Sequence, residues 1–234
     1  MNFQEIKAML AKCGETGQNF LSDGEVKKIL NYYAIPMVRQ GMATSPAEAV
    51  KISNSIGYPV VLKVISPEIS HKTEAQAVKL NLSSSKEVEE ACSDLLLKAQ
   101  AYRPGAKVEG YLIQEMVEDG VEIIVGLHSD PTFGPVTMFG LGGIWVELLK
   151  DVSFRVVPID RSDAVDMVEE IKGSSLLKGF RGRPPVDLEA LYGILLSISK
   201  LGLELKEVQE MDLNPVFLRG KGAVIADARI VIHQ

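Results

Sequence analysis

The chain has 234 residues, of which 46% are hydrophobic and 24% charged, and its formal net charge is -6. These values are typical of a globular protein with one large domain or two smaller lobes. The negative charge disfavours nucleic-acid binding, which needs a basic surface, and no apolar run is long enough for a membrane span. The two cysteines, Cys13 and Cys92, lack metal-ligand spacing and predict reduced thiols in a cytoplasmic protein.

The first half of the chain alternates helices and strands. A short helix is expected over about residues 3–10, and apolar, β-branched runs predict strands at 58–65 and 77–82. Three serines are predicted to cap further helices, because each stands three residues before a glutamate: Ser22, Ser45 and Ser84. This alternation is typical of an α/β arrangement.

The second half begins near residue 108 and is richer in strands. The runs 109–117 and 121–127 are predicted to form a hairpin through an Asp-Gly turn at 118–120. The last helix is expected to stop at Gly202. The remaining elements are expected at 133–140, 153–158, 208–216, 224–226 and 229–232 as strands and at 162–171 and 187–201 as helices. Antiparallel strands with helices predict an α+β lobe.

Two basic residues mark the stretch 57–82. Lys63 lies inside an apolar strand, on the same face as Val61 and Ile65. Because an unpaired buried ammonium is costly, Lys63 must reach water from an edge strand, a carboxylate or an anionic ligand, and the strand alone does not decide among these. His71 lies in the polar loop after this strand, where a lone histidine is most often simply solvated.

Gly142 and Gly143 follow the strand predicted at 133–140. Glycines at such a place allow backbone N–H groups to approach an anion closely, although a glycine cluster is more often a turn. No lysine follows in the spacing of the common phosphate-binding loop.

An acidic face is predicted near the C-terminus. Strand alternation places Glu210, Asp212 and Asn214 on one side, with Asp227 on a nearby strand. Such oxygen ligands suit Mg²⁺ held together with ATP phosphates, whereas the alternative is a solvated acidic sheet face.

The segment from Glu115 through Met116 to Val117 lies where the two halves join. A connector at that place can offer backbone hydrogen bonds to an adenine edge, and Glu122 is near enough in sequence to reach a ribose hydroxyl. Ordinary strand packing is the alternative.

Five long sequence runs occur in order along the chain: YPVVLKVISPEISHKT, QEMVEDGVEIIVG, DPTFGPVTMFGLGGIWVE, LLKGFRGRPPVD and EMDLNPV with ADARI. Taken together, these runs resemble one family along nearly the whole chain, namely the ATP-grasp (β) subunits of ADP-forming acetyl-CoA synthetases, which are related to succinyl-CoA synthetase β subunits. One departure concerns Glu74-Ala-Gln-Ala-Val78, where family members often carry Asp-Val-Gly-Gly-Val.

The resemblance implies an ATP-grasp fold with two lobes around a nucleotide cleft: residues 1–116 with the SHKT loop and 117–234 with the glycine loop and metal site. It implies an acid–thiol ligase that makes ATP from ADP, phosphate and an acyl-CoA. The implied ligands are ATP or ADP with Mg²⁺, bound by Lys63, Gly142 and Gly143 at the phosphates, Glu115 to Val117 at adenine, Glu122 near the ribose, and Asn214 and Asp227 at the metal.

The resemblance also implies that the phosphoryl group passes through histidines. The first belongs to an α subunit that binds CoA, and the family implies an α2β2 hetero-oligomer. His71 is the second relay, and the loop 66–74 is expected to swing between two sites. Asp212, on the face of Asn214, is the candidate that orients the His71 ring.

Two other functions stay open at this point. An ATP-grasp carboxylate–amine ligase would need an acceptor pocket in this chain and no role for His71. A nucleotide-sensing regulatory domain of a protein acyltransferase would keep the fold without turnover.

Overall fold

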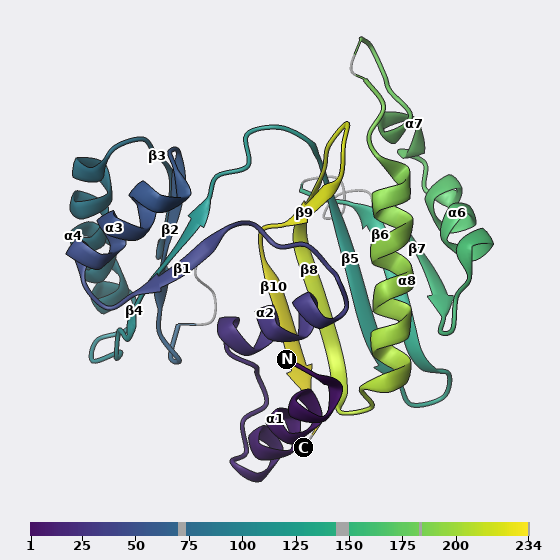
Figure 1. The fold of residues 1–234 in the computed structure, drawn as a ribbon, viewed down its shortest axis with the longest axis horizontal. Helices are drawn as coiled ribbons and strands as arrows, with labels where there is room; N and C mark the ends of the chain where they lie inside the picture. Colours follow the sequence, from purple (N-terminus) through teal and green to yellow (C-terminus); the bar gives the residue numbers. More distant parts are fainter. Residues whose placement is uncertain (70–73, 144–149, 183, 234) are drawn as a thin grey trace. The chain divides into compact units, whose positions relative to one another are not determined.

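The structure is a computed structural model that describes residues 1–69, 74–143, 150–182 and 184–233 (Figure 1). The chain forms two compact units, a smaller unit of Val38–Glu118 and a larger unit of Met1–Met37 with Asp119–Gln234. The chain returns to the larger unit within two residues of the expected lobe boundary at 116/117. The first 37 residues differ from the expectation, because their apolar side chains pack into the core of the larger unit.

The smaller unit is built on a four-stranded antiparallel sheet in the order β1-β4-β2-β3. Its two helices, α3 and α4, cover one face, and their apolar residues form the core with alternate residues of the strands. The elements are β1 (Gln40–Ala43), α3 (Pro46–Ile56), β2 (Val60–Ile65), β3 (Val78–Leu82), α4 (Ser85–Tyr102) and β4 (Gly110–Glu115).

The larger unit is built on a six-stranded antiparallel sheet. Five strands follow the order β10-β8-β5-β6-β7, and β9 pairs with β8. These strands are β5 (Val121–Asp130), β6 (Gly134–Leu141), β7 (Val152–Val156), β8 (Val208–Leu218), β9 (Ala223–Ile225) and β10 (Ala228–Ile232). The predicted strands of the second half are confirmed, although β5 runs to Asp130 and β8 to Leu218, beyond their predicted ends at 127 and 216.

Helices cover one face of the larger sheet, as Figure 1 shows for α2 over β10 and for α8 over β5 and β6. The buried core lies between them and includes alternate residues of β5 and β8, such as Val125 and Leu213. The opposite face of this sheet carries the other alternate residues and is called the open face below. The helices are α1 (Phe3–Glu15), α2 (Asp23–Tyr32), α6 (Arg161–Glu170), α7 (Ser174–Leu177) and α8 (Leu188–Glu204).

The serine caps form as the sequence predicts. The Ser22 hydroxyl accepts a hydrogen bond from the Glu25 N–H, and the Glu25 carboxylate accepts one from the Ser22 N–H at 2.8 Å. The Ser45 and Ser84 hydroxyls likewise accept the N–H of Glu48 and Glu87 at the starts of α3 and α4. The return contact differs, because these two carboxylates accept the N–H of the residue before the cap, Thr44 and Ser83. Each cap satisfies backbone N–H groups that a helix start leaves without partners.

Two local predictions are wrong. β4 and β5 do not form a hairpin, because β4 pairs with β1 and β2 while β5 pairs with β6 and β8. The Asp-Gly segment between them is where the chain passes from one unit to the other. Gly202 does not stop the last helix but lies inside α8, where an added Cβ would stand 3.0 Å from Leu127 Cδ1. This glycine therefore permits close packing of the helix on β5.

No helix among the described residues combines the length and apolar character that a bilayer span requires.

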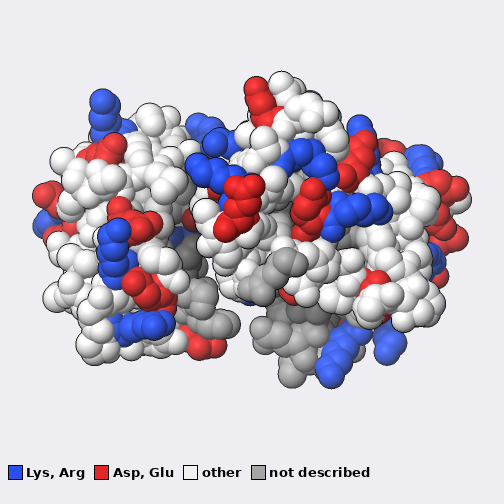
Figure 2. Space-filling model, turned by 90° about the horizontal axis from the view of Figure 1, so that it is seen from below, with Lys and Arg blue, Asp and Glu red and all other residues white. Residues whose placement is uncertain are grey.

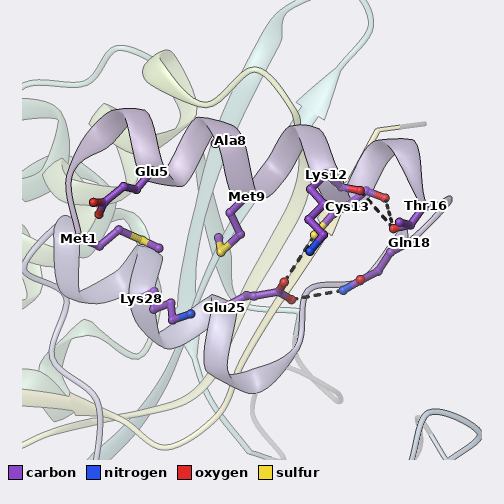
Figure 3. A pocket seen from close by; sticks show the side chains of 10 residues that line it. All are labelled: Met1, Glu5, Ala8, Met9, Lys12, Cys13, Thr16, Gln18, Glu25 and Lys28. Carbon is purple, nitrogen blue, oxygen red and sulfur yellow. Dashed lines mark hydrogen bonds between the residues drawn. The ribbon is translucent and has the colours of Figure 1, made fainter.

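Both cysteines are buried, at 4% exposure for Cys13 and 0% for Cys92. Figure 3 shows Cys13 and Gln18 pointing toward Glu25 beside a hollow between α1 and α2, and the Cys13 thiol donates to Glu25 Oε1 at 3.5 Å. Burial raises the pKa of Cys92 to about 11. Burial also raises the pKa of Cys13, and the negative charge of Glu25 adds to this effect.

We therefore expect neither thiol to react with a disulfide reagent at pH 8, because the reactive species is the thiolate and both groups stay protonated. The measurement is a spectrophotometric thiol titration of the native chain, with the same chain unfolded in guanidinium chloride as the control. Two thiols should be counted after unfolding. Rapid reaction of one thiol in the native chain would contradict the buried, protonated state.

Candidate functional site

Lys63 lies on β2, an interior strand of the smaller sheet, so the interpretation as an edge-strand lysine is wrong. Alternation along β2 is as predicted: Val60 and Leu62 face the helices at 0% exposure, and Lys63 lies on the opposite face at 8%. Its Cα pairs with that of Leu112 on β4. Lys63 therefore places a positive charge, with little exposure to water, on the face of the sheet that the helices α3 and α4 do not cover.

The connector segment begins at the end of β4. The Glu115 N–H donates to the Arg39 carbonyl at 2.8 Å, and the Met116 N–H donates to the Pro59 carbonyl at 3.2 Å. The Glu115 carboxylate accepts from the Arg39 side chain, with 3.1 Å between Nε and Oε2. Val117 is buried. The side chain of Glu115 is thus engaged within the smaller unit, so the segment would meet a ligand through its backbone.

The structure brings Glu122 together with the two predicted glycines. The Gly142 N–H donates to the Glu122 carbonyl at 2.8 Å. A Cβ on Gly142 would lie 3.1 Å from the Glu122 carbonyl carbon, and one on Gly143 would lie 3.3 Å from Glu122 Oε2. Gly143 also has a φ of +62°, which favours glycine. Any side chain at these positions would press on Glu122, so the close backbone approach requires glycine.

The acidic residues of β8 lie on the open face as the alternation predicts. Glu210 and Asn214 are exposed and Asp212 is half-buried, whereas Met211 and Leu213 between them are buried in the core. Asp212 lies beside Gly126 of β5, and the two residues are Cα partners. A hollow of about 540 Å³ opens here and is lined by Ile124, Gly126, Leu127, His128, Asp130, Val136, Met138, Phe154, Glu210, Met211 and Asp212.

Burial raises the pKa of the Asp212 carboxyl, and the negative charges of Glu210 and Asp227 raise it further. The guanidinium of Arg229 acts in the opposite direction. Arg229 is the Cα partner of Asp212 on β10, and its guanidinium stands 4.5 Å from the centre of the Phe20 ring. A neighbouring cation of this kind favours the ionised carboxylate. Arg229 lies in the ADARI run, but no sequence pattern assigned it a role.

The chain matches a family model described as "ATP-grasp domain" over residues 12–232. The chain belongs to the ATP-grasp family. Its two antiparallel sheets, each covered by helices on one face, form the two units of this ATP-grasp fold.

The ATP-grasp chain is similar to subunit beta of acetate–CoA ligase (ADP-forming) I from Pyrococcus furiosus, with 47% identity over 212 residues that cover 91% of each chain. A structure of acetyl-coenzyme A synthetase 1 from Ca. Korarchaeum cryptofilum, in complex with coenzyme A and Ca-AMPCP, has a TM-score of 0.93 at 45% identity and covers 97% of this chain and 99% of that one. Another structure of that enzyme contains Mg-AMPPCP, with its phosphohistidine segment pointing towards the nucleotide-binding site, and has a TM-score of 0.85 at 42% identity with 97% and 100% coverage.

Asn214 and Asp227 fit a magnesium site by their chemistry and placement. The Asn214 N–H donates to the Asp227 carbonyl at 3.1 Å, which holds the two residues side by side. The Ala228 N–H donates to Asp227 Oδ1 at 3.1 Å and fixes that carboxylate. Among the described residues no group of three His, Cys, Asp or Glu side chains is arranged as a metal cage. Two protein oxygen ligands are sufficient where phosphates and water supply the others, as is usual for Mg²⁺.

Residues 70–73 of the predicted loop 66–74, which include His71, lie outside the described residues. The described chain resumes at Glu74 in a turn that contains Gln76, an exposed residue with a φ of +49°. The resembling family often carries a glycine at this position. The departure from the family sequence therefore puts a side chain at a backbone conformation that glycine adopts without strain.

Replacing Gln76 with glycine is expected to raise the free energy of unfolding by about 0.5–1 kcal/mol. Relief of the left-handed conformation contributes about 1–2 kcal/mol, and the greater freedom of glycine in the unfolded chain offsets part of it. Urea denaturation of both proteins measures the difference, with Gln209→Gly on β8 as the control, which should destabilise. A lower stability of Gln76→Gly would contradict strain at this residue.

On the face drawn in Figure 2, basic and acidic side chains of the described residues are interspersed. The described residues therefore form no continuous basic surface on that face.

Proposed function

We propose that this chain is the nucleotide-binding β subunit of an ADP-forming acyl-CoA synthetase, with acetyl-CoA as the acyl substrate. Together with an α subunit it converts acyl-CoA, ADP and phosphate into the free acid, CoA and ATP. The identity of 47% over 91% of both chains with a β subunit of this activity supports the proposal. The carboxylate–amine ligase and the regulatory domain are not favoured, because no similarity described above points to either.

The observation that carries the proposal is the arrangement on the open face of the larger sheet. Asp212 stands two residues from Asn214 on β8, and Asn214 is hydrogen-bonded to Asp227 across the strands. Arg229 lies opposite Asp212. A site that transfers a phosphoryl group needs metal ligands, a cation and a residue that orients the nucleophile, and in the proposed site these residues would take these roles.

In the proposed reaction the α subunit forms an acyl phosphate and CoA from acyl-CoA and phosphate, and its own histidine takes the phosphoryl group and releases the acid. The phosphoryl group then passes to a ring nitrogen of His71. The β-phosphate oxygen of ADP attacks this phosphorus, the P–N bond breaks, and ATP and neutral His71 result. Asp212 is proposed to accept the N–H of the other ring nitrogen, which fixes the tautomer.

The remaining residues would bind and neutralise the nucleotide. Lys63 would contact phosphate oxygens, and Gly142 and Gly143 would lie against the phosphates. The Glu115–Val117 backbone would contact adenine, with Glu122 near the ribose. Mg²⁺ on Asn214 and Asp227 would neutralise charge on the phosphates when bound. In-line positioning then supplies most of the catalysis, because phosphoryl transfer needs little covalent help.

The partner is proposed to be a CoA-binding α subunit in an α2β2 assembly. The Pyrococcus furiosus relative is a subunit beta, which supports a hetero-oligomer. Two buried thiols without a disulfide support a reducing, cytoplasmic location.

The test is a coupled assay of ATP formation from acetyl-CoA, ADP and phosphate, with this chain alone, with the α subunit alone and with both together. Formation of ATP only by the pair is expected. Turnover by this chain alone with an amine acceptor and ATP would instead support the carboxylate–amine ligase. Binding of nucleotide without turnover in every combination would support a regulatory domain.

A further inference from the structure

Arg39 makes three contacts with Glu115 in the smaller unit. Its carbonyl accepts the Glu115 N–H at 2.8 Å, and its own N–H donates to Glu115 Oε2 at 3.4 Å. Its Nε donates to the same carboxylate oxygen at 3.1 Å. The backbone and the side chain of Glu115 are therefore both fixed by one residue.

The two residues stand at the two places where the chain passes between units. Arg39 follows the first passage, after Met37, and Glu115 precedes the return at Glu118. The contacts between them extend the pairing of β1 with β4 by one step beyond the last partners, Gln40 and Gln114. On the other side of the first passage, the Pro36 carbonyl accepts the Ile225 N–H at 2.9 Å within the larger unit. The segment that contains Arg39 is thus anchored on both sides.

Stability does not explain the ion pair. The Arg39 side chain is 63% exposed and that of Glu115 28%, and ion pairs with this access to water contribute little to folding. What the pair does fix is the conformation of the backbone that continues to Met116 and Val117. The Glu115 carboxylate and the N–H groups of Glu115 and Met116 are already engaged. Recognition of a base by this segment therefore depends on where its carbonyl groups and the Val117 N–H point.

We propose that Arg39 is a positioning residue for the nucleotide base, acting through Glu115. It holds the carboxylate and the N–H of Glu115, and so sets the direction of the backbone groups of Glu115–Val117 that recognise the adenine edge. The inference rests on the proposed nucleotide-binding role of that segment. Adenine carries an exocyclic amino group that a carbonyl can accept from, whereas hypoxanthine carries an oxygen at that position. Arg39 therefore also sharpens the choice of ADP over IDP.

The experiment compares Arg39→Ala and Arg39→Lys with the wild-type chain, each in complex with the α subunit. The control is Lys98→Ala, which removes another exposed ion pair of the smaller unit, that between Lys98 and Asp94. We measure the Kd of Mg-ADP by calorimetry, the kcat and KM for ADP and for acetyl-CoA, and the ratio of kcat/KM for ADP over IDP. Thermal unfolding is followed for every variant.

Arg39→Ala is expected to raise the Kd and KM for ADP about tenfold, equivalent to about 1.4 kcal/mol of binding, and to narrow the ADP-over-IDP preference. The kcat, the KM for acetyl-CoA and the melting temperature should stay near the wild-type values. Arg39→Lys keeps one charged contact and should lie between, and Lys98→Ala should behave as wild type. In the double variant Arg39→Ala/Glu115→Ala, the increase in the Kd for ADP should be smaller than the sum of the two single effects, because both substitutions remove the same interaction.

An unchanged Kd for ADP in Arg39→Ala, or an equal loss for all substrates with a lower melting temperature, would overturn the inference. A wild-type complex that binds Mg-ADP without turnover would contradict the proposed function alone, since the Kd comparison still decides the role of Arg39. A wild-type complex that does not bind ADP would overturn both.

Discussion

Replacement of His71 with alanine is expected to abolish acid-labile phosphate on this chain after incubation with Mg-ATP. The phosphoryl group of the proposed intermediate is bonded to the imidazole, and alanine offers no nucleophile. Steady-state ATP formation with the α subunit should fall on the order of 10⁴-fold or more, as is typical when a covalent nucleophile is lost. Intact-mass analysis and acid-labile phosphate counting measure the first effect, and the coupled assay measures the second.

His233→Ala is the matched control, because His233 is an exposed histidine at the other end of the chain. This variant should be phosphorylated to the same extent as the wild type, with no more than one phosphate per chain, and should keep full activity. Asp212→Asn should still be labelled, but about 10–100-fold more slowly, because the amide no longer holds the ring in the required tautomer. Absence of label on the wild type, with nucleotide bound, would remove His71 from the proposed reaction.

Several elements could be predicted because their signals are local. Ser22 and Glu25 are three residues apart, and their capping contacts depend on nothing outside one helical turn. The hairpin at 118–120 was predicted wrongly for the same reason: its turn sequence is local, but the strands on either side find their partners in different sheets. A glycine such as Gly202 is typical of a helix end, and its presence inside α8 is explained by the close packing against Leu127.

The same distinction between local and long-range signals applies to the candidate site. Alternation along a single strand was sufficient to place Glu210, Asp212 and Asn214 on one face, and the structure confirms their alternation with buried residues. Arg39 and Arg229 were missed, because each acquires its partner through the pairing of strands that do not follow each other directly in the chain. Strand register follows from the packing of a whole sheet, so no short sequence pattern predicts the partners of these two arginines.

Replacement of the proposed metal ligands is expected to change the magnesium dependence of the reaction. Asp227→Asn keeps the size of the side chain but removes its charge, and Asn214→Ala removes the neighbouring amide oxygen. Each should raise the Mg²⁺ concentration for half-maximal ATP formation roughly 10–100-fold, and lower the rate at saturating Mg²⁺ by about 10²-fold, because charge on the phosphates is less well neutralised. The measurement is the coupled assay over a range of free Mg²⁺, with ADP binding followed in parallel.

Glu210→Gln is the control for these variants. Glu210 lies on the same strand and face, and it also loses one negative charge, but its Cα partners are His128 and Val231 rather than the residues around Asp227. A general effect of charge on Mg²⁺ affinity would appear in Asp227→Asn and in Glu210→Gln but not in Asn214→Ala. Ligand loss would appear in Asp227→Asn and Asn214→Ala and would spare Glu210→Gln. An unchanged magnesium dependence in Asp227→Asn would mean that the hydrogen-bonded pair of Asn214 and Asp227 serves the sheet and not the metal, and the ligands would then have to be sought elsewhere on the open face.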